Sequence, residues 1–284
     1  MPYINVNDAY ILDNTGKQVD DAVDYALYNS NRNLLDNWYF VGGGSQLGDG
    51  VFPINQRGQT SYSGALCIDR WHADDTVTIY SGYINTGNST MYQVCDNGKI
   101  TPLLGKAVTA SLMLADGTIV SDTQVFPEDP NNRWVIFGST GMASFLAGTS
   151  SQIMRLPGGN NIKAVKLELG TVSTLANDVP PNFGAELRKC KRYLRYVPLT
   201  ITPAAIGGNT AVVTLNGIEM AGVPTPALIS AGGARDAGGT QNITSATVTG
   251  FTYNTPTVQF ALAGNLNSVI GYVYDTVVRL SCEL

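Results

Sequence analysis

The sequence has little charge and few of the side chains that most enzymatic reactions need. Charged residues make up 14% of the 284 residues, and there is a single histidine, His72. With one histidine, a catalytic triad that pairs a nucleophile with a histidine base is hard to build. No Gly-x-Ser-x-Gly, His-Glu-x-x-His or phosphate-loop motif is present. We therefore predict that the protein is not an enzyme and uses no cofactor.

The sequence also lacks the cysteine spacing of a metal site. The four cysteines are Cys67, Cys95, Cys190 and Cys282. None is part of a Cys-x-x-Cys pair, so no metal site is predicted. Lys189 and Lys191 flank Cys190 and would lower the pKa of its thiol, but a buried packing role is more typical of such a residue. All four are expected to be reduced packing residues.

A broad basic surface and long apolar runs are missing as well. The net charge is −5 with 17 Lys and Arg, which argues against nucleic acid as a partner. The N-terminus has no signal-peptide pattern, and no run approaches the roughly 20 apolar residues of a membrane span. We expect a protein that is made and folded in a cytoplasm, or leaves it without cleavage, and that does not insert into a membrane.

What the sequence does contain is short strands. Segments rich in Val, Ile, Thr and Tyr alternate with turns formed by the 31 glycines and by Asn, Asp and Pro. Seven or more such segments over residues 37–170 predict a jelly-roll-like β-sandwich. Further strands over residues 198–284 predict a second, sandwich-like β-domain. The predicted fold class is all-β, and residues 232–241 are expected to form a long exposed loop of the second domain.

Two helices interrupt this pattern. In residues 1–36 an apolar stripe recurs at helical spacing, formed by Val19, Ala22, Val23, Ala26 and Leu27. So short a helix needs a partner, either the following domain or copies of itself around a symmetry axis. Residues 171–197 are predicted to form a loop, broken at Pro180 and Pro181, and then a helix over 183–197 that docks by its apolar face and joins the two β-domains.

The order of these pieces resembles bacteriophage tail-fibre and receptor-binding proteins. The stretches that carry the resemblance are GKQVDDAVDYAL, NLLDNWYF, PINQRGQTSYSGALCIDRW, IKAVKLELGTVSTLA, ELRKCKRYLRYV and RLSCEL. The resemblance implies a virion component, usually a homotrimer, that fixes a phage to a host surface polysaccharide and contacts other tail or capsid proteins through the N-terminal segment. The middle part is similar to jelly-roll modules that bind carbohydrate.

Sugar binding requires aromatic faces and planar polar groups at an accessible place. Trp38, Trp71 and Trp134 lie in predicted strands and are expected in the core. Arg235, Asp236 and Tyr253 lie near loops of the distal domain and are the predicted glycan-binding residues.

Two other classes stay open at this point. A non-viral carbohydrate-binding module would act without a virion. A tail-associated polysaccharide depolymerase would use two carboxylates, for which Glu128 and Glu168 are candidates.

Overall fold

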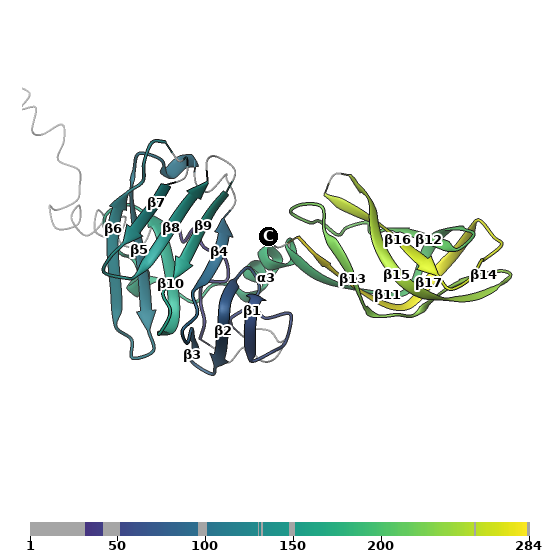
Figure 1. The fold of residues 1–284 in the computed structure, drawn as a ribbon, viewed down its shortest axis with the longest axis horizontal. Helices are drawn as coiled ribbons and strands as arrows, with labels where there is room; N and C mark the ends of the chain where they lie inside the picture. Colours follow the sequence, from purple (N-terminus) through teal and green to yellow (C-terminus); the bar gives the residue numbers. More distant parts are fainter. Residues whose placement is uncertain are drawn as a thin grey trace, which may run out of the picture.

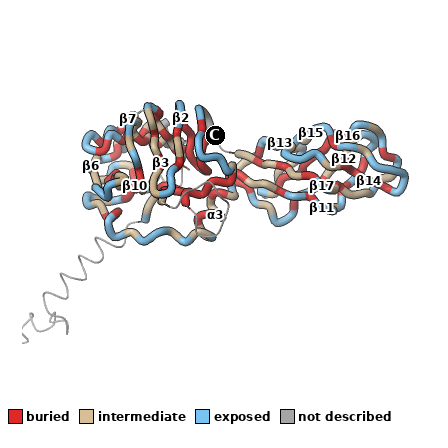
Figure 2. The backbone as a smooth tube through the Cα atoms, turned by 90° about the horizontal axis from the view of Figure 1, so that it is seen from below, coloured by how far each residue is buried: buried red, intermediate tan, exposed pale blue. Residues whose placement is uncertain are grey.

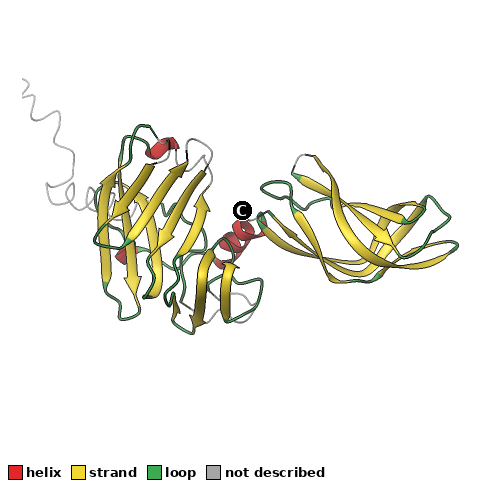
Figure 3. Ribbon diagram, in the orientation of Figure 1, coloured by secondary structure: helices red, strands yellow, loops and turns green. Residues whose placement is uncertain are grey.

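The computed structural model describes residues 32–41, 52–95, 101–129, 131, 133–147, 151–252 and 254–282. Two β-rich lobes lie end to end with helix α3 (Phe183–Lys191) between them (Figure 1). Strands dominate both lobes, and α3 is the one α-helix of the described residues, so the predicted all-β class is confirmed (Figure 3). In the same residues no helix is long and apolar enough to cross a membrane. The predicted N-terminal helix, with Val19, Ala22, Val23, Ala26 and Leu27, lies outside the described residues.

The first lobe, here called the sandwich, is one ten-stranded antiparallel sheet. Its strands are β1 (Ser61–Leu66), β2 (His72–Tyr80), β3 (Tyr83–Asn85), β4 (Met91–Cys95), β5 (Ala107–Leu114), β6 (Ile119–Val125), β7 (Arg133–Phe137), β8 (Met142–Ala147), β9 (Ser151–Leu156) and β10 (Asn161–Leu169). The order is β6-β5-β10-β3-β2-β4-β9-β8-β7, with β1 on β2. The short helix η1 (Thr101–Leu103) precedes β5, and η2 (Leu175–Asn177) follows β10.

The two ends of this sheet enclose a common core. Leu112 of β5 and Leu167 of β10 belong to the same buried cluster as Phe137 of β7 and Met154 of β9. Figure 2 shows the buried residues running through the middle of the lobe. Trp38 and Trp71 lie in this core, as predicted, whereas Trp134 is 51% exposed, so its predicted core position is wrong.

The polypeptide that enters the sandwich packs against β10. Leu34 donates its N–H to the carbonyl of Leu167 (2.9 Å), and the Asn33 side chain donates to the carbonyl of Val165 (2.8 Å). Leu35 is almost fully buried. Residues 33–36, which were predicted to belong to the N-terminal segment, therefore lie against the sandwich.

Strand β10 is buried on both faces. The sequence places Lys166 and Glu168 on the opposite face from Val165 and Leu167, and all four side chains are buried. The Lys166 ammonium donates to Thr174 (2.6 Å) and to Asp178 (2.6 Å), and lies 3.5 Å from the Glu168 carboxylate. These contacts fasten the loop after β10 over the polar face of the strand.

Helix α3 docks on the sandwich by its apolar face, as predicted. Phe183, Leu187 and Cys190 pack with Phe52 and Ile54. The helix begins at the cap residue Asn182, whose side chain accepts the N–H of Ala185 (2.9 Å). The predicted end at residue 197 is wrong, because α3 ends at Lys191 and β11 begins at Leu194. Pairing with the last strand buries Leu194 and Val197, and this tertiary contact overrides their helical spacing.

The second lobe, here called the barrel, has seven strands. They are β11 (Leu194–Gly207), β12 (Thr210–Thr214), β13 (Thr225–Ser230), β14 (Gly233–Asp236), β15 (Gly239–Thr252), β16 (Thr255–Leu262) and β17 (Ile270–Ser281). The order is β11-β12-β16-β15-β14-β17-β13, and β11 also pairs with β17, so the sheet closes on itself instead of forming the two separate layers of a sandwich.

The barrel core is small and mainly aliphatic. Val213, Val258, Val273 and Leu280 surround a single buried phenylalanine, Phe260. The long exposed loop predicted over residues 232–241 is absent here, because these residues form the β14–β15 hairpin. A tight turn joins its strands, and the Asp236 side chain accepts the N–H groups of Gly238 (2.7 Å) and Gly239 (2.9 Å).

Candidate functional site

Of the three predicted glycan-binding residues, Arg235 lies in a surface groove. The groove has a volume of about 370 Å³ and is here called the tip groove. It is lined by Thr200, Ile201, Arg235, Thr240, Tyr272, Tyr274 and Asp275. Strand pairing builds it: Arg235 of β14 lies opposite Tyr272 of β17 on one side and Thr240 of β15 on the other. Arg235 is exposed, so its guanidinium is accessible to a ligand.

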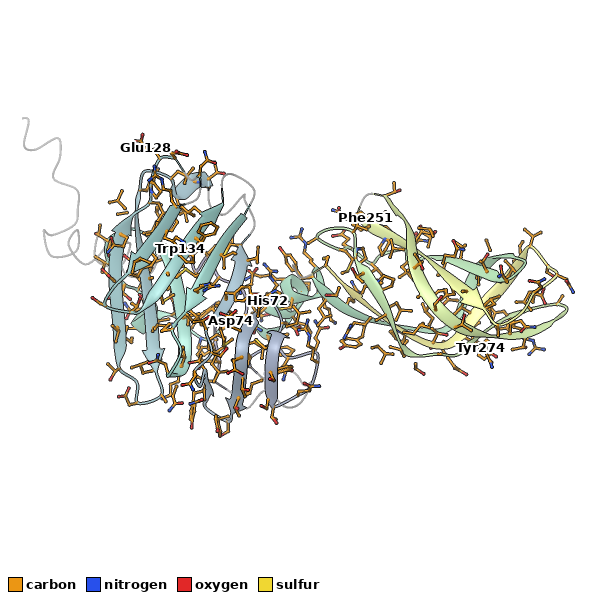
Figure 4. The ribbon with its side chains drawn as sticks, viewed as in Figure 1. His72, Asp74, Glu128, Trp134, Phe251 and Tyr274 are labelled. Carbon is orange, nitrogen blue, oxygen red and sulfur yellow. The ribbon has the colours of Figure 1, made fainter. Side chains whose placement is uncertain are left out.

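A glycine gives the tip groove its shape. Gly233 lies opposite Tyr274 across the β14–β17 pair. A Cβ atom at Gly233 would overlap the Tyr274 ring, so the absence of a side chain lets this ring lie flat across the strand. Tyr272 lies next to it, with ring centroids 6.2 Å apart. Two tyrosines and an arginine therefore share one outer face of the barrel, and Figure 4 labels Tyr274 among them.

Asp236 does not face this groove. Its buried carboxylate accepts four backbone N–H groups, from Gly238, Gly239, Asn267 and Ser268. These hydrogen bonds, with that of Ser268 the strongest, lower the pKa of the Asp236 carboxyl below its usual value. The prediction that Asp236 binds glycan has no support from this geometry, because both of its oxygens already accept backbone N–H groups. Tyr253 lies outside the described residues.

A second group of side chains lies on the outer face of the sandwich and is here called the aromatic row. Its members are His72 (β2), Tyr92 (β4), Arg155 (β9), Phe145 (β8) and Trp134 (β7). Strand pairing sets His72 opposite Tyr92, and Tyr92 opposite Arg155. Trp134 lies opposite Phe145 on the neighbouring pair of strands. Figure 4 shows Trp134 and His72 on this lobe and Tyr274 on the other.

The aromatic row is a continuous series of ring contacts. The rings of His72 and Tyr92 stack at 4.9 Å and 12°. The Arg155 guanidinium carbon is 5.8 Å from the centroid of Tyr92 and 5.7 Å from that of Trp134. Trp134 and Phe145 are 4.9 Å apart. Cation–π attraction at these distances holds the guanidinium between two rings.

Arg155 has a polar atom that the protein leaves unused. Its Nε is buried and has no hydrogen-bond partner among the described residues. An unpaired buried donor costs about 1–3 kcal/mol, so such atoms are rare in native proteins and often lie at functional places. The same guanidinium lies on the face of the sandwich that carries Trp134.

Sequence reasoning missed the aromatic row, because residues 134–137 are four consecutive apolar residues and show no alternation in the sequence. In β7, Val135 and Phe137 are buried, whereas Trp134 and Ile136, which alternate with them, are exposed. This alternation over residues 133–137 is the period of a half-buried strand and places Trp134 on the outer face. The contacts with Phe145, Arg155 and Tyr92 come from strand pairing and have no signature in the sequence.

The two carboxylates considered for polysaccharide cleavage, Glu168 and Glu128, differ in their exposure to solvent. Glu168 is fully buried, and its oxygens accept the N–H and the hydroxyl of Thr174 (2.8 and 2.5 Å). A polymer cannot reach it. Glu128 is exposed at the edge of the sandwich that is uppermost in Figure 4. Within the described residues, no three His, Cys, Asp or Glu side chains are grouped so that they would hold a metal ion.

The thiol of Cys190 is shielded rather than activated. Burial raises its pKa well above the usual value, and the carboxylates of Asp69 and Glu186 add to the effect. The side chains of Lys189 and Lys191 do not reverse this, and Lys189 forms an ion pair with Glu186 at 2.6 Å. None of the four cysteines, all of which lie in the described residues, forms a disulfide, and three of them are buried.

The comparisons with known proteins give no relative. No protein-family profile matches the chain, and searches of curated proteins and of solved structures found no significant match.

Proposed function

We propose that the protein is an attachment component of a bacteriophage virion and that it binds a glycan of the host cell surface. The aromatic row is the observation that supports glycan binding. A tryptophan that is 51% exposed and in contact with a second aromatic ring offers the flat apolar surface on which the apolar side of a sugar ring stacks. Arg155 adds planar donors for hydroxyl or carboxylate oxygens at the same place.

The tip groove gives the proposed adhesin a second contact. Tyr272, Tyr274 and Arg235 repeat the combination of aromatic faces and a planar cation on the barrel. Two weak sites on one chain bind a repeating polymer more tightly than either does alone, because the second contact is intramolecular. A homotrimer, which the family resemblance suggests, would multiply this gain.

The virion part of the proposal rests on the sequence resemblance described above. An N-terminal segment that contacts other tail or capsid proteins, followed by two β-lobes, is the order expected of a fibre protein. The alternatives are a carbohydrate-binding module outside any virion and a depolymerase. Each is an outcome of the experiments below.

Tryptophan fluorescence tests glycan binding at a single place. Of the three tryptophans, Trp38 and Trp71 are buried and Trp134 is exposed. The full chain is titrated with purified soluble capsular and lipopolysaccharide-derived polysaccharides. A bound sugar should shift the Trp134 emission and protect it from acrylamide quenching. Trp134→Ala lacks this reporter, so its affinity is measured by calorimetry and should be weaker by about tenfold or more.

Tyr80→Ala is the matched control. Tyr80 is also an exposed aromatic on an outer strand position, and it stacks on Tyr83 at 5.0 Å, at the opposite end of β2 from His72. This variant should bind as the unaltered chain does. Equal loss in both variants, or no polysaccharide that binds, would overturn the glycan proposal. Release of reducing ends during the titration would favour the depolymerase.

The virion assignment has a separate test. Light scattering of the full chain should give the mass of a trimer, and Val23→Glu with Leu27→Glu should give a monomer if the apolar stripe lies on the symmetry axis. Antibodies against the chain should label phage particles in electron micrographs. A monomeric chain that binds polysaccharide but labels no particle would instead indicate a solitary carbohydrate-binding module.

A further inference from the structure

A cavity lined by cations lies where helix α3 meets the barrel. It has a volume of about 480 Å³ and is here called the joint pocket. Its lining residues are Arg188, Lys191, Arg192, Arg195, Gly217 and Glu219. Three of its cations come from α3 and its C-cap, one from the start of β11, and the remaining wall from the connection between β12 and β13.

Hydrogen bonds fix the walls of the joint pocket relative to one another. The carbonyl of Arg192 accepts the N–H of Ala221 (2.7 Å), which joins the end of α3 to the β12–β13 connection. It also accepts the Cys282 thiol (3.2 Å), and the Tyr193 carbonyl accepts the Cys282 N–H (2.8 Å). On the sandwich side, Gln56 donates to the carbonyl of Leu194 (2.9 Å). The four cations therefore project from a rigid frame.

Among the described residues, the cations of the joint pocket outnumber its carboxylates. Four cations line the pocket together with one carboxylate, Glu219, and residues 283–284, which follow Cys282, lie outside the described residues. Cations near the end of a helix gain from its dipole, which is equivalent to about half a charge. That gain accounts for Arg188 and Lys191 but not for Arg195, which lies in β11. Four full charges exceed what the dipole offsets.

We propose that the joint pocket binds the anionic group, phosphate or carboxylate, of an acidic saccharide. Three guanidinium groups match the planar, bidentate geometry of phosphate and carboxylate oxygens. The volume accommodates a charged sugar unit. Gly217 has a positive φ of 76° and lets the β12–β13 connection turn tightly beside the cavity. This inference rests on the proposed glycan binding and specifies the ligand as acidic.

The distribution of charge favours a saccharide over a nucleic acid. Nucleic-acid binding requires a stripe of cations that follows successive phosphates. Here the cations converge on one cavity, and the chain carries a net charge of −5. A single anionic group held in a cavity is the arrangement that fits.

The test uses the full chain and three small probes: mannose 6-phosphate, glucuronate and neutral mannose. Binding is followed by calorimetry and by the arginine Nε–H signals in ¹⁵N-labelled protein. We expect one or both anionic sugars to bind and to shift arginine signals, and mannose not to. Binding should weaken as the salt concentration rises, because the contact is between charges. The anion that binds more tightly identifies the anionic group.

Lys191→Gln combined with Arg195→Gln is the test variant, and Lys106→Gln is the matched control. Lys106 is an exposed lysine of the sandwich that lines no cavity described here. The test variant should bind the anionic sugar about tenfold or more weakly, whereas the control should leave affinity unchanged. Equal loss in both, no shift of arginine signals in the unaltered chain, or tighter binding of a single-stranded oligonucleotide would overturn the proposal. Trp134→Ala should leave mannose 6-phosphate binding intact, which separates failure of this site from failure of the aromatic row.

Discussion

The sandwich and the barrel are both β-lobes, but they bury polar groups to very different extents. In the sandwich, Asn37, Asp69, Arg70 and Lys166 are almost fully buried together with Glu168. Within the described barrel strands, the buried charged or polar residues are Asp236 and Thr276. The sandwich holds loops, the entering chain and α3 through buried polar contacts, whereas the barrel closes on itself through backbone pairing.

This difference has a physical reason. The sandwich carries long connections whose backbone groups must find partners once they are covered. Asn37 shows how: its side chain donates to the carbonyls of Ile54 and Asp69 (both 2.8 Å) and accepts the N–H of Ile54 (2.7 Å). In the barrel, β11 and β17 pair over eleven residue positions and leave few backbone groups in need of side chains. Sheet closure thus replaces side-chain contacts as the means of fixing the lobe.

The largest change in unfolding free energy is expected for a substitution of Lys166 in the sandwich. Lys166→Met removes the cation that lies between Glu168 and Asp178 and leaves the Glu168 carboxylate buried without its partner. We expect a loss of about 3–5 kcal/mol in the free energy of unfolding of the sandwich. Denaturation followed by tryptophan fluorescence measures this lobe alone, because all three tryptophans lie in it. Lys163→Met, on the same strand but only half buried, should change stability by less than about 0.5 kcal/mol.

Asn37 is the next most sensitive position of the sandwich. Asn37→Ala deprives three buried backbone groups of their partners, and we expect the sandwich to lose about 2–4 kcal/mol. The same fluorescence measurement applies. Asn85→Ala removes an exposed hydrogen bond to Asn161 (2.6 Å) and a part-buried one from the N–H of Gly87 (2.9 Å), and should cost less than Asn37→Ala. Similar costs for the two variants would contradict the view that buried polar contacts fix this lobe.

The stability of the barrel should depend more on the close approach of its strands than on any single side chain. A Cβ atom at Gly271 would overlap the backbone carbonyl of Arg235, and no rotamer change relieves such a clash. Gly271→Ala should therefore destabilise the barrel by about 1–3 kcal/mol. Gly239→Ala, where a Cβ meets nothing within 4 Å, is the control. Hydrogen exchange of barrel peptides measures this loss of stability. The unfolding transition of the sandwich, followed by tryptophan fluorescence, should be unchanged in Gly271→Ala.

The smallest effect at neutral pH is expected from the ionisation of Asp236. Hydrogen bonds to its carboxylate lower the pKa in the folded barrel below the unfolded value of 3.8. The stabilisation is thus present above the unfolded pKa and is lost as the pH falls through the folded pKa. The protection factors of barrel peptides, which are corrected for the pH dependence of intrinsic exchange, should begin to fall below about pH 4, and Asp236→Asn should remove this fall. An unchanged acid response in Asp236→Asn would show that other groups control it.

Local patterns in the sequence predicted much of the fold. The strand-rich composition gave the all-β class, and the apolar spacing of Phe183, Leu187 and Cys190 predicted a docked helix before a second β-region. The candidate sites were less predictable. Arg235 lies in a groove with Tyr272 and Tyr274, but Asp236 serves a turn, and the loop proposed for both is a hairpin. The glycines around Arg235 and Asp236 correctly indicated a turn. A turn of this kind can simply join two strands, so it did not by itself indicate a binding loop.

The sequence by itself determined which segments extend and which side chains alternate, because these depend on neighbours along the chain. Only the tertiary structure decided the end of α3, the closure of the barrel, the exposure of Trp134 and the meeting of Arg188 with Arg195 in one pocket. Each of these depends on pairing between residues far apart in sequence. Strand register and docking, which no local window contains, bring His72, Tyr92 and Arg155 into one row and four cations around one cavity.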